Sequence, residues 1–465
     1  MNSLSISQIA EFAGARLEAG DGSVIVKKIS TDSRTIKRGD LFVALRGENF
    51  DGHQFIDAVA QSGAAGAIVD PNWSGPQLPD QFAVLRAADT LTAYQSLAAN
   101  YRKSLSIKVL AITGSNGKTT TKDFAASVLS RKFSVTKTEG NFNNHVGLPR
   151  TILEATSDHQ IAVWEIGMNH PGEIAALAEI AAPNAAIITN VGVAHIEFMG
   201  SRESIAQEKG SLAESVSRDG TVILNAEDPF SEAIAQRTKA KVVFAGIDRG
   251  TVRAIEVRQT PDGSEFTILE EAHRCRAQLP VPGVHMIQNA LLAVAAGRTF
   301  GLSIEECAAG LAAAPLTKAR LQIREIRGVR FIDDSYNANP DSMTAALRTL
   351  VELDAEGKRV AVLGEMRELG SETKQGHAQV GEAAAEFGID HLIAIGENGA
   401  LIAEAAQKAG LTNAATVNTT SEAADLLGNI ITPGDLVLIK GSRLAATERV
   451  IEEFAKQRTA EDVIR

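Results

Sequence analysis

The stretch VLAITGSNGKTTTK, residues 109–122, joins a strand-like apolar run to a helix through a short turn that contains two glycines. Glycines allow backbone N–H groups to turn toward an anion, and the amino end of the following helix adds partial positive charge. A glycine turn with a purely structural purpose would need neither the lysine nor the three threonines. The stretch therefore predicts a phosphate-binding loop at the carboxyl end of a buried strand.

Each residue type in this loop suits one part of a nucleotide. The Lys118 ammonium suits the β- and γ-phosphates, and the Thr119 hydroxyl suits a Mg²⁺ ion bound to them. The plain phosphate-loop pattern has a glycine where this chain has Ile112, so the loop is a shorter variant. The residues predicted to bind ATP in this loop are Thr113, Gly114, Ser115, Asn116, Gly117, Lys118, Thr119 and Thr120.

Length, charge and cysteine content exclude several classes of protein. The chain has 465 residues, which is too long for one core and suits about two to four domains. Its net charge of −11 argues against sequence-independent binding of nucleic acid or of an anionic membrane. The two cysteines, Cys275 and Cys307, have no metal-ligand spacing, so we expect a reducing cytoplasm and no disulfide framework.

The amino-terminal residues 1–20 are typical of a polar amphipathic helix rather than of a secretion signal. No run of the sequence reaches the ~18 apolar residues of a membrane span. We therefore expect a cytoplasmic α/β enzyme that works as a monomer.

Short apolar strands alternate with helical stretches and organise the chain into three predicted domains, residues 1–85, 86–314 and 315–465. In the second and third domains the strands end in polar turns, which is typical of parallel sheets with crossover helices. The expected fold is α/β, with a small N-terminal α/β domain, a central P-loop parallel-sheet ATPase domain and a C-terminal doubly wound Rossmann-like domain. The expected strands lie within 64–70, 82–89, 107–113, 161–167, 185–191, 221–227, 329–335, 359–366, 391–397 and 435–442, and a helix is expected at 91–105.

Three side chains beyond the loop indicate a metal site, and each has a simpler alternative. Glu165 ends the strand IAVWEIG, where a carboxylate would lie beside the phosphate loop and bind Mg²⁺, or would instead cap the next helix. His195 follows another strand and would by itself be a turn histidine. Lys209 would by itself be a solvated helix lysine.

Several segments occur in the order found in one enzyme family. They are TGSNGKTTTK, EIGMN, NVGVAHIEFMGSRESIAQEKG, GVHMIQNALLAVA, ARLQ and DDSYNANPDSM, and with TDSR and KGSR they span almost the whole chain. The chain resembles the Mur ligases, and DDSYNANPDSM resembles their D-alanyl-D-alanine-adding subgroup. The resemblance implies an ATP-dependent amide ligase that joins D-alanyl-D-alanine to UDP-N-acetylmuramoyl-tripeptide through an acyl phosphate. The implied setting is cytoplasmic peptidoglycan synthesis, and so cell-wall biogenesis, cell shape and cell division.

The resemblance also implies roles for particular residues, with ATP and Mg²⁺ as cofactors. Lys209 matches the lysine that is carbamylated in Mur ligases, which would turn a cation into an anionic metal ligand. The implied metal ligands are Thr119, Glu165, His195 and carbamylated Lys209, and the implied catalytic residues are Lys118, Lys209, His195 and Arg320. The implied ATP contacts outside the loop are Asn289 at the adenine, Arg320 at the phosphates and Asp334 at the ribose.

Two further groups of polar residues are expected at the ends of the substrates. Ser33 and Arg34, in the turn TDSR, would bind the UDP part, although that turn alone is typical of an ordinary helix cap. The remaining expected contacts are Asn141, Asn143 and Asn144 for the UDP-substrate, and Tyr336, Asn337, Asn339 and Ser342 for the dipeptide.

Two other functions compete with this interpretation. Another amide ligase of the same superfamily, either another Mur ligase or a folylpolyglutamate synthase, would not explain DDSYNANPDSM or the TDSR arrangement. A regulatory nucleotide-binding protein would bind ATP without forming a product, and it would not need the Glu165, His195 and Lys209 set. The chain also has no Asn-Lys-x-Asp element of the kind that reads guanine in regulatory GTPases.

Overall fold

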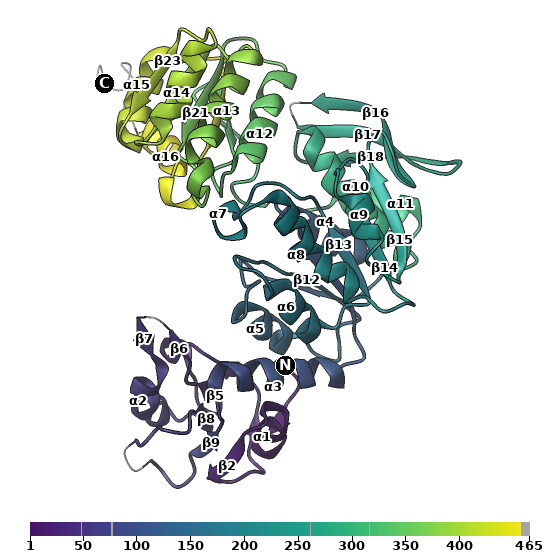
Figure 1. The fold of residues 1–465 in the computed structure, drawn as a ribbon, viewed down its shortest axis with the longest axis vertical. Helices are drawn as coiled ribbons and strands as arrows, with labels where there is room; N and C mark the ends of the chain where they lie inside the picture. The colour runs from purple at the N-terminus through teal and green to yellow at the C-terminus, as the bar shows by residue number, and fades with distance from the viewer. Residues whose placement is uncertain (48, 76–77, 261, 316, 457–465) are drawn as a thin grey trace.

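Three large sheets follow one another along the described part of the chain, and Figure 1 shows them in succession along the long axis of the molecule. The computed structural model describes residues 1–47, 49–75, 78–260, 262–315 and 317–456. The predicted C-terminal domain also includes residues 316 and 457–465, which lie outside the described residues. Within the described part of the chain, no helix has both the length and the apolar character that a membrane crossing requires.

The first unit is built on a five-stranded sheet with the strand order β2-β9-β8-β5-β4, parallel except for β2. Its elements are β1 (Leu4–Ser5), α1 (Ile6–Ala13), β2 (Arg16–Ala19), β3 (Ile25–Val26), β4 (Ile29–Ser30), η1 (Ser33–Thr35), β5 (Leu41–Val43), β6 (Arg46–Gly47), β7 (Phe50–Asp51), η2 (Gly52–Phe55), α2 (Ile56–Gln61), β8 (Gly66–Val69) and β9 (Ala83–Arg86). The expected helix over residues 1–20 is shorter than predicted. Gly14 ends α1 in a left-handed conformation with φ 62°, and the chain continues as β2.

The middle unit contains a nine-stranded sheet with the strand order β11-β12-β10-β13-β14-β15-β16-β17-β18. Its elements are α3 (Thr90–Ser104), β10 (Lys108–Thr113), α4 (Lys118–Leu129), β11 (Val135–Lys137), α5 (Gly147–Glu154), β12 (Ile161–Glu165), α6 (Glu173–Ala181), β13 (Ala185–Ile188), α7 (Ile196–Met199), α8 (Arg202–Glu214), β14 (Thr221–Asn225), α9 (Ser231–Ala235), β15 (Lys241–Gly246), β16 (Val252–Thr260), β17 (Gly263–Glu270), β18 (His273–Leu279), α10 (Val284–Thr299) and α11 (Ile304–Ala312).

The strand pairing confirms the predicted parallel sheet from β11 to β16 but not beyond it. The expectation that strands and helices alternate throughout this unit is wrong for β16, β17 and β18. These strands follow one another with too few residues between them for a crossover helix, so they pair antiparallel.

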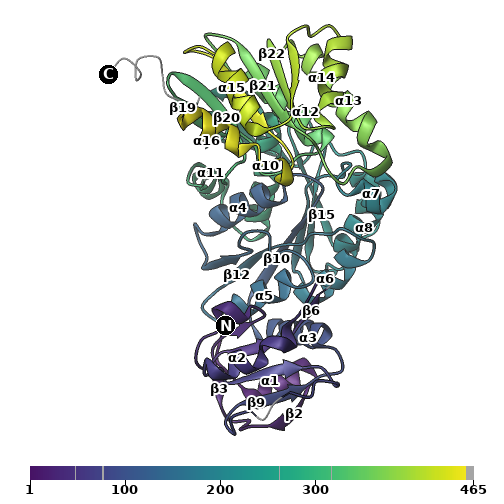
Figure 2. The same cartoon turned by 90° about the vertical axis from the view of Figure 1, so that its left-hand side faces the viewer.

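Helices cover both faces of the parallel part of this sheet. Leu110 and Ile112 of β10 belong to an apolar cluster with residues of α4, α10 and α11, whereas Val109 and Ala111 belong to a second cluster with residues of α3, α5, α6 and α8. The side chains of a strand alternate between its two faces, so a continuous apolar run is buried on both. Figure 2 shows α4 and α8 on opposite sides of these strands.

The C-terminal unit contains a six-stranded sheet with the order β19-β20-β24-β21-β22-β23, parallel except for β19. Its elements are β19 (Gln322–Ile326), β20 (Val329–Asp333), α12 (Pro340–Glu352), β21 (Arg359–Gly364), η3 (Gly370–Glu372), α13 (Thr373–Glu386), β22 (His391–Ile395), α14 (Gly399–Lys408), β23 (Ala414–Val417), α15 (Thr420–Ile430), β24 (Leu436–Lys440), η4 (Arg443–Ala445) and α16 (Glu448–Lys456). Residues of α12, α13 and α14 pack in one apolar cluster and residues of α15 and α16 in another, as the doubly wound prediction requires. The edge strands β19 and β23 were not expected from the sequence.

The predicted domain limits fall close to the changes from one sheet to the next. Residue 85 lies one residue before the end of β9, and residue 314 lies between α11 and β19. We keep both limits as predictions of where the units part.

Helix α3 joins the first unit to the middle unit through apolar packing and one buried hydroxyl. Tyr94, Leu97 and Tyr101 of α3 belong to the same apolar cluster as residues of α1 and α5. The Tyr101 hydroxyl accepts a hydrogen bond from the Asn2 N–H at 2.6 Å and donates one to the Ala155 carbonyl at 2.7 Å. This hydroxyl therefore connects the amino-terminal segment to the end of α5.

Replacing Tyr101 with phenylalanine tests the importance of this bridge. We expect Tyr101→Phe to lower the free energy of unfolding by about 1–3 kcal/mol, because a buried carbonyl and an N–H lose their partner. Tyr94→Phe is the matched control, since Tyr94 is equally buried on the same helix and its hydroxyl has no hydrogen bond to a described residue. Urea unfolding of the two variants should show a loss for Tyr101→Phe alone, and equal losses would contradict the bridge.

Candidate functional site

The loop after β10 has the backbone that the sequence predicts for phosphate binding. Gly114 and Gly117 have φ angles of 151° and 78°, in the region that side chains with a Cβ rarely adopt. A Cβ at Gly117 would also lie 2.4 Å from Asn289 Oδ1 of α10. Lys118 then begins α4, and its Nζ donates a hydrogen bond to the Gly114 carbonyl at 2.8 Å.

Two backbone N–H groups of this loop already donate hydrogen bonds to other residues of the protein. The Ser115 N–H donates to the Asn190 carbonyl and the Asn116 N–H donates to Asn190 Oδ1, each at 2.9 Å. The first amide groups of α4 have no partner within a helix, so they remain as donors for an anion. Ser115–Thr120 line the cavity described below, and the prediction that Thr113–Thr120 contacts ATP stays a prediction.

Glu165 and Thr119 come together at the ends of adjacent strands. The Thr119 hydroxyl donates to Glu165 Oε2 at 3.0 Å, and Asn143 Nδ2 donates to Oε1 at 2.8 Å. Glu165 is only 2% exposed, and among the described residues it forms no ion pair. A buried carboxylate beside a hydroxyl, with no ion pair to a described residue, fits a hard divalent cation such as Mg²⁺.

Lys209, on α8, is buried to 1% exposure, and across the described ranges its ammonium has neither a hydrogen bond nor an ion pair. Burial first, and the positive charge of Lys118 second, hold the pKa of Lys209 well below its usual value. Burial also lowers the pKa of Lys118. Two like charges this close, one of them on the buried Lys209, favour an anion as a common neighbour.

His195 lies at the amino end of α7 and contacts a different unit. Its Nδ1 lies 2.6 Å from Glu368 Oε2, in the loop between β21 and η3. No contact joins His195 to Glu165 or Lys209 in the described part of the chain, and no group of three or more His, Cys, Asp or Glu side chains is gathered there as a ready-made metal site. Among the predicted metal ligands, the described residues show direct contact between Thr119 and Glu165 alone.

The C-terminal unit supplies charge to the same place. Arg320 Nη2 donates to Thr119 Oγ1 at 3.4 Å, and the guanidinium lies 4.4 Å from the centre of the Tyr336 ring. Arg320 Nε is buried without a hydrogen-bond partner among the described residues, so it is available to an anion. Asp334 accepts a hydrogen bond from the buried Lys440 ammonium.

These groups surround one cavity of about 820 Å³ between the middle and C-terminal units. It is lined by Lys118, Thr119, Glu165 and His195 from the middle unit and by Arg320 and Asp334 from the C-terminal side. Asn289 and the predicted dipeptide residues also line it. Ser33, Arg34, Thr113, Gly114 and Lys209 do not.

Several predicted substrate contacts have partners inside the protein. Asn144 Oδ1 accepts hydrogen bonds from Val146 and Gly147 at the start of α5, and Asn143 is bound to Glu165 as described above. Asn339 and Ser342 cap α12 reciprocally, and Asn339 Nδ2 also donates to Asn116 Oδ1 at 2.7 Å. The Asn337 carbonyl accepts from Lys440.

Ser33 and Arg34 lie in the first unit, away from the cavity. Arg34 is exposed and paired with Asp32 at 2.9 Å. These residues follow β4, which pairs in parallel with β5, so they share an edge of the sheet with the segment that follows β5. The sequence interpretation missed that segment, although the carboxyl ends of parallel strands are common ligand positions.

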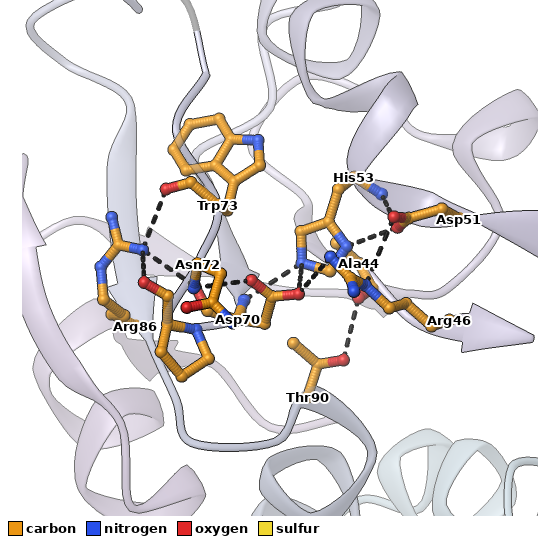
Figure 3. Close-up of polar contacts among 10 residues, drawn as sticks. Ala44, Arg46, Asp51, His53, Asp70, Asn72, Trp73, Arg86 and Thr90 are labelled. Carbon is orange, nitrogen blue, oxygen red and sulfur yellow. Dashed lines mark hydrogen bonds and ion pairs between the residues drawn. The ribbon is translucent and has the colours of Figure 1, made fainter.

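A polar cluster follows β5 and β8, as Figure 3 shows. Arg46 Nε lies 3.3 Å from Asp51 Oδ2, and Arg46 Nη2 lies 2.6 Å from Asp70 Oδ2. His53 Nε2 accepts the Asp70 N–H at 3.1 Å, and His53 Nδ1 lies 2.6 Å from Asp51 Oδ1. Because Nε2 accepts the backbone N–H of Asp70, Nδ1 carries the proton that faces the Asp51 carboxylate, and the carboxylates of Asp51 and Asp70 both pair with Arg46.

The comparisons with known proteins agree on one family. Family profiles match residues 25–87 (Mur ligase family, catalytic domain), 112–297 (Mur ligase middle domain) and 319–443 (Mur ligase, glutamate ligase domain). The UDP-N-acetylmuramoyl-tripeptide–D-alanyl-D-alanine ligase of Bacillus subtilis (strain 168) is 38% identical over 434 residues, which are 92% of this chain and 93% of that protein.

Two solved structures are similar over nearly the whole chain. A crystal structure of MurF from Acinetobacter baumannii has a TM-score of 0.91 at 34% identity and covers 98% of this chain and 100% of that one. The MurF ligase of Thermotoga maritima in complex with ADP has a TM-score of 0.84 at 29% identity and covers 92% of this chain and 97% of that one.

Gly117→Ala tests the geometry of the loop. We expect the affinity for ATP or ADP, measured by titration calorimetry, to fall at least about tenfold, because the new Cβ meets Asn289 and disfavours the left-handed conformation. Gly388→Ala is the matched control, since Gly388 has φ 71° but a Cβ at that position would meet nothing within 4 Å. Unchanged affinity in Gly117→Ala would contradict this placement of the nucleotide.

Proposed function

Because the chain belongs to the Mur ligase family, we propose that it joins D-alanyl-D-alanine to UDP-N-acetylmuramoyl-tripeptide and uses ATP to do so. The observation that supports this most is the similarity, along almost the entire chain, to ligases named for this reaction. The cavity supports it as well, since a phosphate loop and cationic groups from two units meet there.

The reaction needs an activated carboxyl group, because a carboxylate has no good leaving group. Transfer of the γ-phosphoryl group of ATP to the terminal carboxylate of the tripeptide gives an acyl phosphate. The neutral amine of D-alanyl-D-alanine then attacks the carbonyl carbon, and phosphate leaves as the amide bond forms. Lys118 and Arg320 would hold and neutralise the transferred phosphoryl group, and closure around them would exclude water.

Magnesium would be held by Thr119 and Glu165, whose oxygens are 3.0 Å apart in a buried place. When bound there, Mg²⁺ would neutralise charge on the phosphates. His195 and a carbamate on Lys209 are proposed as the other protein ligands. The lowered pKa of Lys209 supports the carbamate, because the neutral amine is the form that adds to CO₂.

The remaining assignments follow the sequence interpretation. We propose that Asn289 and Asp334 bind the nucleoside part of ATP, and both are buried at the cavity. Ser33 and Arg34 are proposed to bind the UDP part, with the amides of Asn141, Asn143 and Asn144 nearer the phosphate loop. Tyr336, Asn337, Asn339 and Ser342 are proposed for the dipeptide, through the surfaces that they present to the cavity.

We also propose that the chain works as a monomer in the cytoplasm, in the synthesis of peptidoglycan precursors. Both nucleotide substrates suit an intracellular enzyme.

Product analysis tests the proposed reaction. Purified protein with ATP, UDP-N-acetylmuramoyl-tripeptide and D-alanyl-D-alanine should form the pentapeptide product and equal amounts of ADP and phosphate. Replacing the dipeptide with L-glutamate should give no product, and the opposite preference would contradict the proposal.

Lys118→Ala should slow product formation by roughly 10²–10³-fold or more, since a cation at the phosphates is lost. Lys132→Ala, at an exposed lysine beyond the end of α4, is the matched control and should remain active.

Lys209→Arg tests the carbamate. The lowered pKa keeps the wild-type amine neutral at a pH where an ordinary lysine is charged, so ¹³C-bicarbonate should give a carbamate signal in the NMR spectrum. Arginine cannot form it, and both the signal and ligase activity should be lost. The signal should also fade as the pH falls through the lowered pKa, because protonation removes the nucleophilic amine. A wild-type protein without the signal, but with full activity, would exclude the carbamate.

A further inference from the structure

Glu368 reaches from the C-terminal unit to a predicted metal ligand of the middle unit. Its Oε2 lies 2.6 Å from His195 Nδ1, and both residues line the central cavity. The sequence interpretation did not select Glu368, and no step of the proposed mechanism uses it.

The loop that carries Glu368 is anchored on both sides of it. Met366 and Leu369 are buried in the apolar core, and Glu368 lies between them in the sequence. The Met366 N–H donates to His377 Nε2 at 3.0 Å, while His377 Nδ1 lies 2.7 Å from the Thr373 carbonyl. A loop held in this way presents the carboxylate from a fixed position.

Both partners adopt an uncommon backbone conformation where the two loops meet. His195 has φ 64° and Glu368 has φ 61°, in the left-handed region that costs about 1–3 kcal/mol for a residue with a side chain. The Glu197 N–H donates to the Glu368 carbonyl at 3.4 Å, so backbone and side chain make contact together. Two residues with this energetic cost at one contact indicate that the contact is functional.

The carboxylate decides which nitrogen of His195 can bind a ligand. A carboxylate at Nδ1 keeps a proton on that nitrogen and leaves the lone pair on Nε2, as is usual for histidines that bind metals. Nε2 has no partner within the part of the chain that the structure describes. It is therefore the nitrogen left for a cation at the cavity.

We propose that Glu368 is a positioning residue that fixes the tautomer and orientation of His195 for a divalent cation. Because Glu368 belongs to the C-terminal unit, the cation site in the middle unit is complete only when the two units are docked. The proposal rests on the proposed function for one point only, the divalent cation that accompanies ATP.

Manganese provides a probe that does not depend on turnover. Wild-type protein with a non-hydrolysable ATP analogue and Mn²⁺ should show coupling of a histidine nitrogen to the metal in pulsed EPR spectra, and His195→Ala should abolish it. In Glu368→Gln we expect this coupling to weaken and the Mn²⁺ affinity to fall by about tenfold or more, the usual effect of losing the partner of a metal-binding histidine. Glu372→Gln is the matched control, since its carboxylate has no partner among the described residues, and it should behave as the wild type does.

Further measurements separate positioning from simple docking of the units. If Glu368 acts through His195, adding Glu368→Gln to His195→Ala should change the Mn²⁺ affinity no further, whereas additive losses would overturn the proposal. Small-angle scattering should show the same dimensions for Glu368→Gln and wild type with the analogue bound, and an opened variant would make Glu368 a docking contact only, which also overturns it. Wild-type affinity and coupling in Glu368→Gln would overturn it directly. Failure of the wild type to ligate the dipeptide would instead reject the proposed function.

Discussion

Burying the phosphates of a nucleotide requires compensating positive charge, and here the charge comes from two units of the chain. Lys118 and Lys209 belong to the middle unit. Burial, and then the charge of Lys118, lower the pKa of Lys209; for Lys118 burial lowers the pKa, Glu165 raises it and Arg320 lowers it. Arg320 arrives from the C-terminal side and contacts Thr119. Without a bound anion, the positive charges of Lys118, Lys209 and Arg320 repel one another. A phosphate group bound between them would be attracted by all three. Binding of the nucleotide and approach of the C-terminal unit are therefore coupled through charge.

The phosphate loop is also a joint between segments that are distant in the sequence. Asn116 donates its N–H to Asn190 and accepts a hydrogen bond from Asn339 of α12, so the loop, the segment after β13 and the C-terminal unit meet at one residue. Asp341 of α12 accepts the Val193 N–H at 3.1 Å in the same region. A shift of α12 must therefore disturb the loop that holds the phosphates. Through these hydrogen bonds, the position of the C-terminal unit directly affects the loop that holds the reacting phosphates.

The sequence predicted those parts of the structure that depend on local pattern. Apolar runs that end in Gly, Asp or Ser identified β10, β12, β13 and β14 of the middle sheet and β20, β21, β22 and β24 of the C-terminal sheet. The strand ends also placed Thr119 and Glu165 together. The hairpins β16–β18 were missed because the surrounding alternation of strands and helices was extended over them. Asn190 and Glu368 were missed because their partners are 74 and 173 positions away in the chain, which no local spacing reveals. Asn143 and Asn144 were assigned to substrate, but an amide that suits a sugar suits an internal carboxylate or helix end equally well.

Apolar packing joins the middle unit to both of its neighbours, because the cluster with residues of α4, α10 and α11 continues into α12 and α13, but only the second joint also has polar contacts at the cavity. The first joint is the apolar cluster around α3, whose separation would expose large buried side chains such as Tyr94 and Tyr101. The contacts at the cavity are instead polar: Asn116 with Asn339, Thr119 with Arg320, and His195 with Glu368. Water can replace a hydrogen bond such as Asn116–Asn339 at a net cost of only about 1 kcal/mol, so these polar contacts are the easier part of this joint to separate when substrates enter. Closing them again surrounds the acyl phosphate with protein groups and keeps water from it.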